Sequence, residues 1–160
     1  MAELHPDIRR TLVFFRKDDQ ILLAMKKRGF GAGKWNGVGG KIEAGETIEE
    51  ALVRESVEEV SMKPLSWKKV AELDFIQDAE TDPWHMYVHA YISEEWEGEP
   101  TESEEMKPQW YKITDIPYSD MWDDDEFWVP RILAGETVFG NFTFNEHDIM
   151  TSHAIRQADF

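Results

Sequence analysis

Six of the ten glycines of this 160-residue chain fall within residues 29–40 (GFGAGKWNGVGG). Glycine brings no side chain and adopts backbone conformations that other residues avoid, so this density argues against a helix or the interior of a regular strand. The segment is therefore predicted to be a loop. Its backbone N–H and C=O groups could approach a phosphate or a metal ion closely, because no side chains stand in the way.

Apolar runs on either side of the glycine segment predict a β-sheet. Residues 11–15 (TLVFF) and 21–25 (ILLAM) are separated by a polar turn and predict a hairpin. Further runs, rich in aromatic and β-branched residues, predict strands at residues 67–75, 84–92, 109–113 and 138–144.

Two helices are expected between these strands. Thr47 and Glu50 form a capping-box pattern that begins a helix over residues 47–60. Residues 127–133 predict a second, shorter helix with Gly135 as its C-terminal cap. The expected fold class is α/β (α+β), with five or six strands and two helices in a single domain.

Composition narrows the classes of partner. The chain has 33 acidic and 17 basic residues and a net charge of −16, which argues against binding a nucleic-acid polymer. No apolar run approaches the roughly 18 residues of a membrane span, and the start of the chain, residues 1–10, is too charged for a signal peptide. The length of 160 residues predicts one domain over residues 1–160. The absence of cysteine favours the cytoplasm as the location. The polar residues 145–160 are expected to add a helix or a strand.

The most specific chemistry lies on the first predicted helix. Glu55, Glu58 and Glu59 stand at positions i, i+3 and i+4 and therefore share one helix face, where they would repel one another without a cation. Converging carboxylates are typical ligands of Mg²⁺ or Mn²⁺. Glu46 could turn toward the same side. Arg54 projects about 100° around the helix from Glu55, which favours bracing a carboxylate or a loop carbonyl over neutralising the cluster.

The spacing of these residues resembles the signature of the Nudix family, G-x5-E-x7-R-E-U-x-E-E-x-G-U, where U is an aliphatic residue. The glycine and all charged positions match, and the motif spans about residues 40–62. Two positions depart from it. Ser56 replaces an aliphatic residue and is expected to weaken one core contact, and Ser61 replaces a glycine and is expected to alter the helix exit. The matching residues are Gly40, Glu46, Arg54, Glu55, Glu58 and Glu59.

The resemblance extends over about residues 11–144, through residues 26–50 and 103–130, to the branch of the family that acts on oxidised purine nucleoside triphosphates. It implies a Nudix fold, a mixed β-sheet sandwiched between helices. It also implies Mg²⁺-dependent hydrolysis, with Mn²⁺ as an alternative, of 8-oxo-dGTP or 2-oxo-dATP to monophosphate and pyrophosphate. By position, Gly40, Glu55, Glu58 and Glu59 would hold the metal, Glu59 would activate water, and Arg54 would complete the catalytic group.

Two places could recognise a base. Trp122 lies beside three aspartates, and Asn36 lies in the glycine segment. An indole face stacks on purines, and neighbouring buried aspartates cannot both ionise at low cost, so one can donate a proton while the other accepts. Alternatively, the aspartates are an exposed cap that opens the second helix.

The resemblance favours the pocket over the cap. It places Asn36, Trp122, Asp124 and Asp125 against the purine, and Lys26 near a phosphate or the nucleotide edge. Asp123, where the family more usually has proline, is expected to add a carboxylate beside the pair. Residues expected to line the pocket are Thr11, Phe30, Phe75 and Trp128.

Two other functions stay open at this point. One is hydrolysis of another nucleoside diphosphate derivative, such as a dinucleoside polyphosphate, an alkylated purine triphosphate, a nucleotide sugar or a capped RNA end. The other is a Nudix-fold module that binds nucleotides without cleaving them. The interpretation as a hydrolase of oxidised purine triphosphates predicts a monomer that acts on a small nucleotide, cleans the nucleotide pool and so prevents DNA damage.

Overall fold

Strand β1 (Ile8–Lys17) runs through the middle of the fold and is covered on both faces. Its side chains alternate between two hydrophobic cores: Leu12 and Phe14 enter one, and Val13 and Phe15 enter the other. A strand that is buried on both faces reads as a continuous apolar run, as residues 11–15 do. The computed structural model describes residues 8–160, so most of the charged start of the chain lies outside the described residues.

The described residues form a nine-stranded mixed sheet and a separate two-stranded ribbon. The long sheet has the order β11-β10-β6-β7-β1-β2-β3, with β4 paired to β1 and β9 paired to β2. The pairs β1–β7 and β6–β10 are parallel, and the other pairs are antiparallel. The remaining strands of this sheet are β2 (Gln20–Lys26), β3 (Trp35–Asn36), β4 (Val38–Lys41), β6 (Lys68–Gln77), β7 (His85–Ser93), β9 (Met106–Lys112), β10 (Val138–Phe144) and β11 (Met150–Gln157), and the ribbon pairs β5 (Lys63–Pro64) with β8 (Trp96–Glu97).

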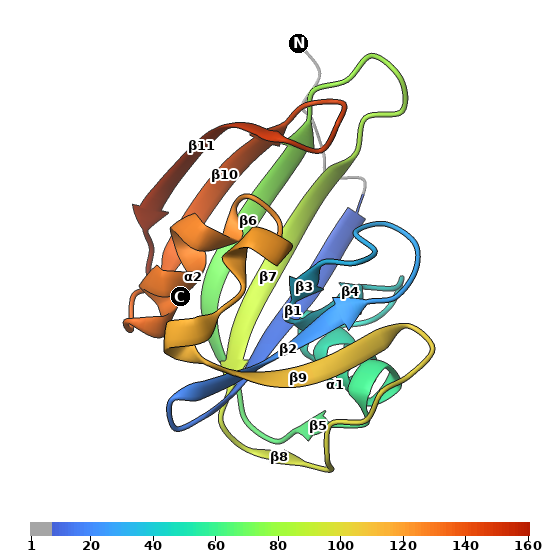
Figure 1. Cartoon of the computed structure of the whole chain (residues 1–160), viewed down its shortest axis with the longest axis vertical. Coiled ribbons are helices and arrows are strands. Elements are labelled where there is room, and N and C mark those ends of the chain that lie inside the picture. Colours follow the sequence, from blue (N-terminus) through green and yellow to red (C-terminus); the bar gives the residue numbers. More distant parts are fainter. Residues whose placement is uncertain (1–7) are drawn as a thin grey trace.

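Two α-helices cover opposite faces of the sheet (Figure 1). Helix α1 (Ile48–Val60) packs Leu52 and Val60 into the core that contains Val13, and α2 (Asp125–Leu133) packs Trp128 and Val129 into the core that contains Phe14. Two 3₁₀ turns, η1 (Ile113–Asp115) and η2 (Tyr118–Asp120), lead from β9 to α2. This arrangement is the expected mixed sheet between helices.

No helix within residues 8–160 is both long and apolar enough to cross a membrane.

The strand count was underestimated from the sequence. All six predicted strands, including the two of the hairpin, are present with shifted ends, but the sheet also contains β3, β4 and β11. Residues 145–160, left open between helix and strand, contain β11, whose side chains are mostly exposed because it lies at the edge of the sheet. A polar edge strand carries little of the apolar pattern that reveals strands in a sequence.

The prediction of a loop over the whole glycine segment was wrong in its second half, where β3 pairs with β2 and β4 pairs with β1. Gly39 and Gly40 are needed there for close approach. A Cβ at Gly39 would lie 1.9 Å from the carbonyl oxygen of Thr11, and one at Gly40 would lie 2.3 Å from the carboxyl carbon of Glu55. Glycine inside a strand therefore marks tight packing against β1 and α1.

Helix α1 has the predicted start and an unusual end. The Thr47 hydroxyl accepts a hydrogen bond from the Glu50 N–H, and the Glu50 carboxylate accepts one from the Thr47 N–H, each at 3.1 Å. Ser61 ends the helix in the left-handed conformation with φ +62°, which is the conformation that glycine would adopt there. The backbone therefore leaves the helix along the usual path, and the serine adds conformational strain. Ser56 is fully buried, and its hydroxyl donates to the carbonyl of Leu52 at 2.8 Å.

Helix α2 begins two residues earlier than predicted, at Asp125. The sequence placed its start after the acidic run because aspartate favours helix caps over helix interiors. In the structure Asp124 is the N-terminal flanking residue, yet its side chain makes no capping hydrogen bond. Gly135, predicted as the cap, lies one residue beyond the capping residue Ala134. Gly135 has φ +96° and occupies the position after the cap, where glycine is favoured.

Replacing Ser61 with glycine should stabilise the protein. The φ of +62° at Ser61 suits glycine, and removing the strain of a side chain there is worth about 1 kcal/mol of unfolding free energy, or roughly 2–4 °C in Tm. Thermal unfolding of Ser61→Gly measures this effect. Ser119→Gly is the control, since Ser119 does not have a positive φ, and it should lower Tm. Equal effects of the two variants would contradict the strain at Ser61.

Candidate functional site

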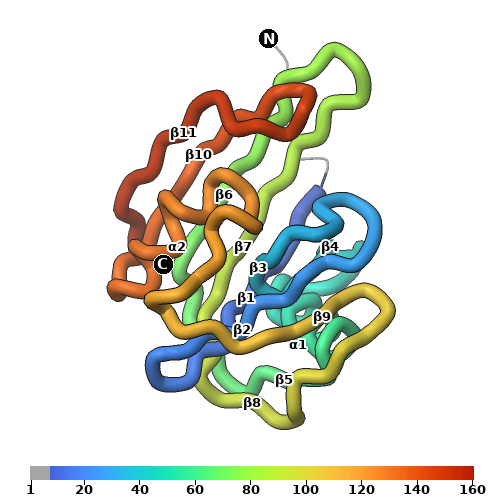
Figure 2. Tube along the Cα trace, viewed as in Figure 1, coloured from blue at the N-terminus to red at the C-terminus, as the bar shows by residue number. Residues whose placement is uncertain are grey.

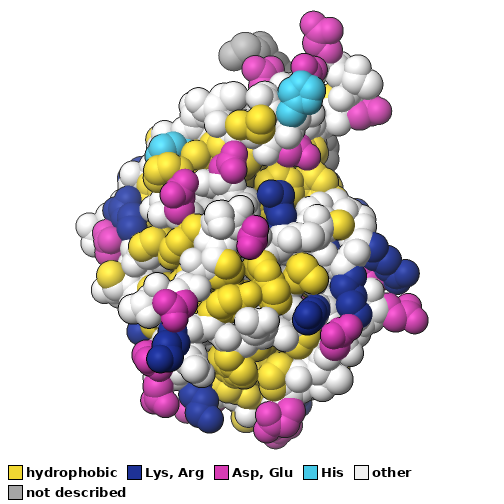
Figure 3. All heavy atoms as spheres, in the orientation of Figure 1, with side chains coloured by type: hydrophobic (Ala, Val, Ile, Leu, Met, Phe, Trp, Pro, Cys, Tyr) yellow, Lys and Arg dark blue, Asp and Glu magenta, His cyan; other side chains and the backbone are white. Residues whose placement is uncertain are grey.

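A cavity of about 290 Å³ is lined by residues of β1, β2, β4, β6 and β7 and of both α-helices. Segments far apart in the chain meet there: a Cβ at Gly31, in the glycine segment, would lie 3.2 Å from Nε1 of Trp122, before α2 (Figure 2). On the face shown in Figure 3, apolar side chains gather at the centre with charged side chains around them. Of the site residues expected from the sequence, those that line the cavity are Thr11, Lys26, Phe30, Asn36, Gly40, Glu55, Glu59, Phe75, Trp122, Asp124, Asp125 and Trp128.

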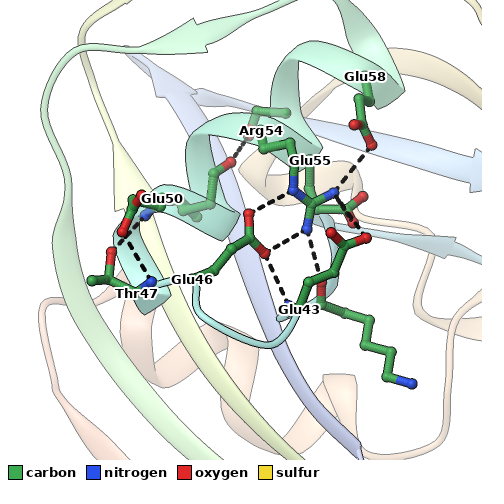
Figure 4. Close-up of polar contacts among 10 residues, drawn as sticks. Glu43, Glu46, Thr47, Glu50, Arg54, Glu55 and Glu58 are labelled. Atoms are coloured by element: carbon green, nitrogen blue, oxygen red, sulfur yellow. Dashed lines mark hydrogen bonds and ion pairs between the residues drawn. The ribbon is translucent and has the colours of Figure 1, made fainter.

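Arg54 and Glu58 lie outside the cavity lining and belong to a charged network behind it (Figure 4). The Arg54 guanidinium donates to both carboxylate oxygens of Glu46, at 2.6 and 2.8 Å, and to the carbonyl oxygen of Lys41 at 3.1 Å. It also donates to Glu55 at 2.9 Å and to Glu58 at 3.2 Å. A bidentate pair of this kind is among the stronger charged contacts in proteins.

This network corrects two expectations. Arg54 braces a carboxylate and a loop carbonyl as predicted, but it also neutralises Glu55 and Glu58, because its long side chain reaches around the helix. Glu46 does not join the acidic cluster. Its carboxylate is held by Arg54 and by the N–H of Glu43, and the hydrogen bonds from Arg54 lower the pKa of Glu46 to about 2.

Glu55 and Glu59 form the acidic end of the cavity. Burial is the main cause that raises the pKa of both, and it brings the pKa of Glu59 to about 7, with Glu55 and Glu105 adding repulsion. One oxygen of Glu59, Oε2, is buried and has no hydrogen-bond partner among the described residues. A buried carboxylate oxygen without a donor is costly unless something positive binds it.

These groups fit a divalent cation by their chemistry. Among the described residues, no three His, Asp or Glu side chains converge closely enough to hold a metal ion, and Glu55 and Glu58 instead contact Arg54. The unpartnered Glu59 Oε2 and the nearby Glu55 carboxylate are hard oxygen donors, the type that Mg²⁺ and Mn²⁺ prefer. Turning Glu58 away from Arg54 would add a third.

Asp124 and Asp125 form the opposite end of the cavity. Both are almost fully buried, at 3% and 2% exposure, so the alternative of an exposed helix cap is wrong. Burial raises the pKa of Asp124 to about 6 and, together with repulsion from Asp124, raises the pKa of Asp125 well above its ordinary value. Oδ2 of Asp124 accepts a hydrogen bond from Nε1 of Trp128 at 2.8 Å, and Oδ2 of Asp125 has no partner among the described residues.

Asp123 does not lie beside this pair as expected. Its side chain is exposed, and Oδ2 accepts a hydrogen bond from the backbone N–H of Met150 at 3.0 Å. Its charge still adds to the causes that raise the pKa of Asp124. The extra carboxylate therefore contacts the start of β11 and does not enter the cavity.

Aromatic rings form the walls near the aspartates. Phe30 lies 5.1 Å from Trp122 between ring centroids, and Phe75 stacks on Phe142 at the same distance. The ammonium group of Lys34 lies 5.3 Å from the Trp122 ring centroid. Flat apolar walls with a few buried polar groups are typical of sites for planar ligands.

Several lining residues were missed in the sequence. Arg10 shares a face of β1 with Leu12, which is a signal that strand alternation could have provided. Trp84 precedes β7 and reaches the cavity only because of how β6 and β7 pair, so no local pattern identifies it. The missed residues that matter for charge or shape are Arg10, Lys34, Trp84 and Glu105.

The fold and site define the class of protein. Residues 6–132 match the model of the NUDIX domain, and the chain belongs to the Nudix family. It is 42% identical over 149 residues to the oxidized purine nucleoside triphosphate hydrolase of Mus musculus and 44% identical to the Danio rerio protein of that name, covering 93% of this chain and 94% of each relative. The crystal structure of the mutator MutT protein from Bacillus halodurans superimposes with a TM-score of 0.83 at 26% identity, covering 92% of this chain and 97% of that one.

The raised pKa of Asp125 predicts how stability depends on pH. The folded protein keeps a proton on Asp125 that the unfolded chain releases above about pH 4, so this residue costs stability as pH rises from 3.8 through the higher pKa of the folded state. Asparagine does not titrate. The Tm of Asp125→Asn should therefore gain on the wild type between pH 4 and pH 7, most at pH 7.

Thermal unfolding across that range measures the difference. The matched control is Glu126→Gln, at an exposed position next to Asp125 in α2. Parallel curves of Tm against pH for Asp125→Asn and the wild type would contradict the raised pKa.

Proposed function

We propose that this protein hydrolyses oxidised purine nucleoside triphosphates, such as 8-oxo-dGTP and 2-oxo-dATP, to the monophosphate and pyrophosphate. The observation that carries the proposal is a single cavity with a buried aspartate pair at one end and the acidic face of α1 at the other. The printed activity of the mouse and zebrafish relatives, which align over 93% of the chain, supports the same substrates.

The aspartate end suits an oxidised purine. Because Asp124 and Asp125 have raised pKa values and adjoin each other, one can donate a hydrogen bond through its proton while the other accepts. Oxidation of a purine changes which ring positions donate and which accept. In this proposal Asn36 adds an amide to the same base edge, Trp122 supplies a stacking surface, and Thr11, Phe30, Phe75 and Trp128 complete the pocket.

The other end suits the phosphates. Lys26 and Arg10 both line the cavity close enough to interact electrostatically with each other and with Glu59, and Nε of Arg10 is buried without a hydrogen-bond partner among the described residues. Two neighbouring cations repel each other, and a bound anion would offset the repulsion that the nearby glutamates leave. A triphosphate supplies that anion, so we assign both side chains to phosphate binding.

The carbonyl of Gly40 and the carboxylates of Glu55, Glu58 and Glu59 would hold the divalent cation, Mg²⁺ or alternatively Mn²⁺. When bound, the cation neutralises charge on the phosphate oxygens. Glu59 is also assigned the role of taking a proton from the attacking water. Arg54 orients Glu55 and Glu58 through the hydrogen bonds described above. The elements of water add across the α–β phosphoanhydride bond, which breaks to give the nucleoside monophosphate and pyrophosphate.

A monomer that acts on a free nucleotide is part of the same proposal. The cytoplasmic location and the role in cleaning the nucleotide pool belong to the same proposal. The net charge of −16 is compatible with it, because the phosphate end of the cavity carries its own cations.

A substrate panel tests the function. With Mg²⁺ present, pyrophosphate release should be fastest from 8-oxo-dGTP or 2-oxo-dATP and much slower from dGTP, with O6-methyl-dGTP as an alkylated comparison. Glu59→Gln should keep its fold and lose at least about a hundredfold in kcat, while Glu49→Gln, on the exposed side of α1, should remain active. Turnover of other nucleoside diphosphate derivatives alone, or binding without any cleavage, would replace the proposed function.

Arg10 provides a second test with a matched control on the same strand. Arg9 is exposed, and its guanidinium contacts Nε2 of His89 at 3.2 Å, outside the cavity. Arg10→Met should raise the KM for 8-oxo-dGTP about tenfold, because a charged hydrogen bond to phosphate is lost, while Arg9→Met should change KM less than about twofold. Steady-state kinetics on both variants measures this, and equal KM values would remove Arg10 from the phosphate site.

A further inference from the structure

The turn between β10 and β11 contacts the base end of the cavity through one carboxylate. Oδ1 of Asp148 accepts a hydrogen bond from the indole Nε1 of Trp84 at 3.2 Å and from the side-chain amide of Gln77 at 3.1 Å. Gln77 ends β6, and Trp84 directly precedes β7. Asp148 thus joins the C-terminal turn to both ends of the β6–β7 connection.

This turn is held by its own hydrogen bonds. The side-chain oxygen of Asn145 accepts from the N–H groups of His147 and Ile149, at 2.8 and 3.1 Å, and the Asn145 N–H donates to the carbonyl of Ile149 at 2.8 Å. Asp148 adopts φ +59°, a conformation that aspartate, asparagine and glycine tolerate better than other residues. The position of the Asp148 carboxylate is therefore set by the turn itself.

A second contact ties the same turn to the aspartate pair. Asp123 accepts a hydrogen bond from the N–H of Met150, and Asp123 is the residue directly before Asp124. The turn therefore contacts Trp84 on one side and the segment that carries the aspartate pair on the other. Residues 145–150 lie far from α1 in sequence and have no other role in the site described so far.

Trp84 is a wall of the cavity at right angles to the proposed stacking surface. Its ring lies 6.5 Å from that of Trp122 between centroids, with 79° between the planes. It also packs 5.7 Å from Phe30 and 5.6 Å from Phe144. A planar base that lies along Trp122 meets Trp84 with its edge, so Trp84 limits how far the base extends in its own plane.

We propose that Trp84 is a specificity-determining residue for the base and that Asp148 is the positioning residue that fixes its indole. The ligand class is a purine whose edge substituents are small, and the inference rests on the proposed function for the identity of the base. In the absence of the Asp148 acceptor, the indole loses its only polar anchor among the described residues and can turn away from the base edge.

The test combines kinetics with direct binding. Trp84→Ala should weaken binding of the product 8-oxo-dGMP, measured by calorimetry without metal, at least about fivefold, because the aromatic contact is lost. It should also shift the ratio of kcat/KM for O6-methyl-dGTP over 8-oxo-dGTP at least about fivefold toward the bulkier base.

Three further variants separate positioning from general structure. Asp148→Gly keeps the backbone conformation but removes the acceptor, and it should shift the same ratio about two- to threefold. Asp148→Asn keeps an acceptor and tolerates φ +59°, and it should restore the wild-type ratio. Asp18→Gly is the matched control, since Asp18 has φ +55° in the distant β1–β2 turn, and it should change neither binding nor the ratio.

Unchanged 8-oxo-dGMP affinity and unchanged ratio in Trp84→Ala would overturn the assignment of Trp84. A shift in Trp84→Ala with no shift in Asp148→Gly would overturn the role of Asp148. If the wild type cleaves no purine triphosphate, the proposed function fails, and the affinity of wild type and Trp84→Ala for 8-oxo-dGMP still decides whether Trp84 bounds the base.

Discussion

The Arg54 guanidinium holds together the part of the molecule on which the phosphate end depends. It joins α1 to the segment before it through Glu46 and the carbonyl of Lys41, and it balances two carboxylates of the helix. Lys41 directly follows Gly40, so the same contacts fix where β4 lies against α1. Without this cation, Glu46, Glu55 and Glu58 would repel one another beside the second half of the helix, and the close approach of β4 would lose its support.

The two ends of the cavity are built by different layers and joined by β1. The acidic end uses β4 and helix α1 on one face of the sheet, while the aspartate end uses the start of α2 on the other face. Strand β1 is hydrogen-bonded to β4, which belongs to the acidic end, and to β7, which follows Trp84 at the aspartate end. Because the side chains of β1 are buried in two cores, a tightly packed strand sets the distance between the two ends.

Features that depend on neighbours in sequence could be predicted. The capping box at Thr47, the shared face of Glu55, Glu58 and Glu59, and the apolar run of β1 follow from local spacing alone, and the structure contains each of them. The burial of Asp124 and Asp125 needed the resemblance to the Nudix family, since the residues by themselves fitted an exposed cap equally well.

Features that depend on tertiary partners could not be predicted. The role of Trp84 comes from the pairing of β6 with β7, and the role of Asp123 comes from a backbone N–H that lies 27 residues away in the chain. The reach of Arg54 to Glu58 depends on a side-chain conformation selected by Glu46 and Lys41 together. Sequence spacing gives the direction of a side chain from its helix but not the partners that compete for it.

The glycines of residues 29–40 fall into two kinds with different evolutionary freedom. Gly33 has φ +87° and open space around it, so another residue there bears a modest conformational cost that a stable domain can absorb. A methyl group at Gly39 would overlap the backbone of Thr11, and one at Gly40 would displace the carboxylate of Glu55. A substitution at Gly39 therefore requires a compensating shift in β1, and one at Gly40 requires a compensating shift of Glu55 on α1. The contacts among β1, β4 and α1 must consequently evolve together.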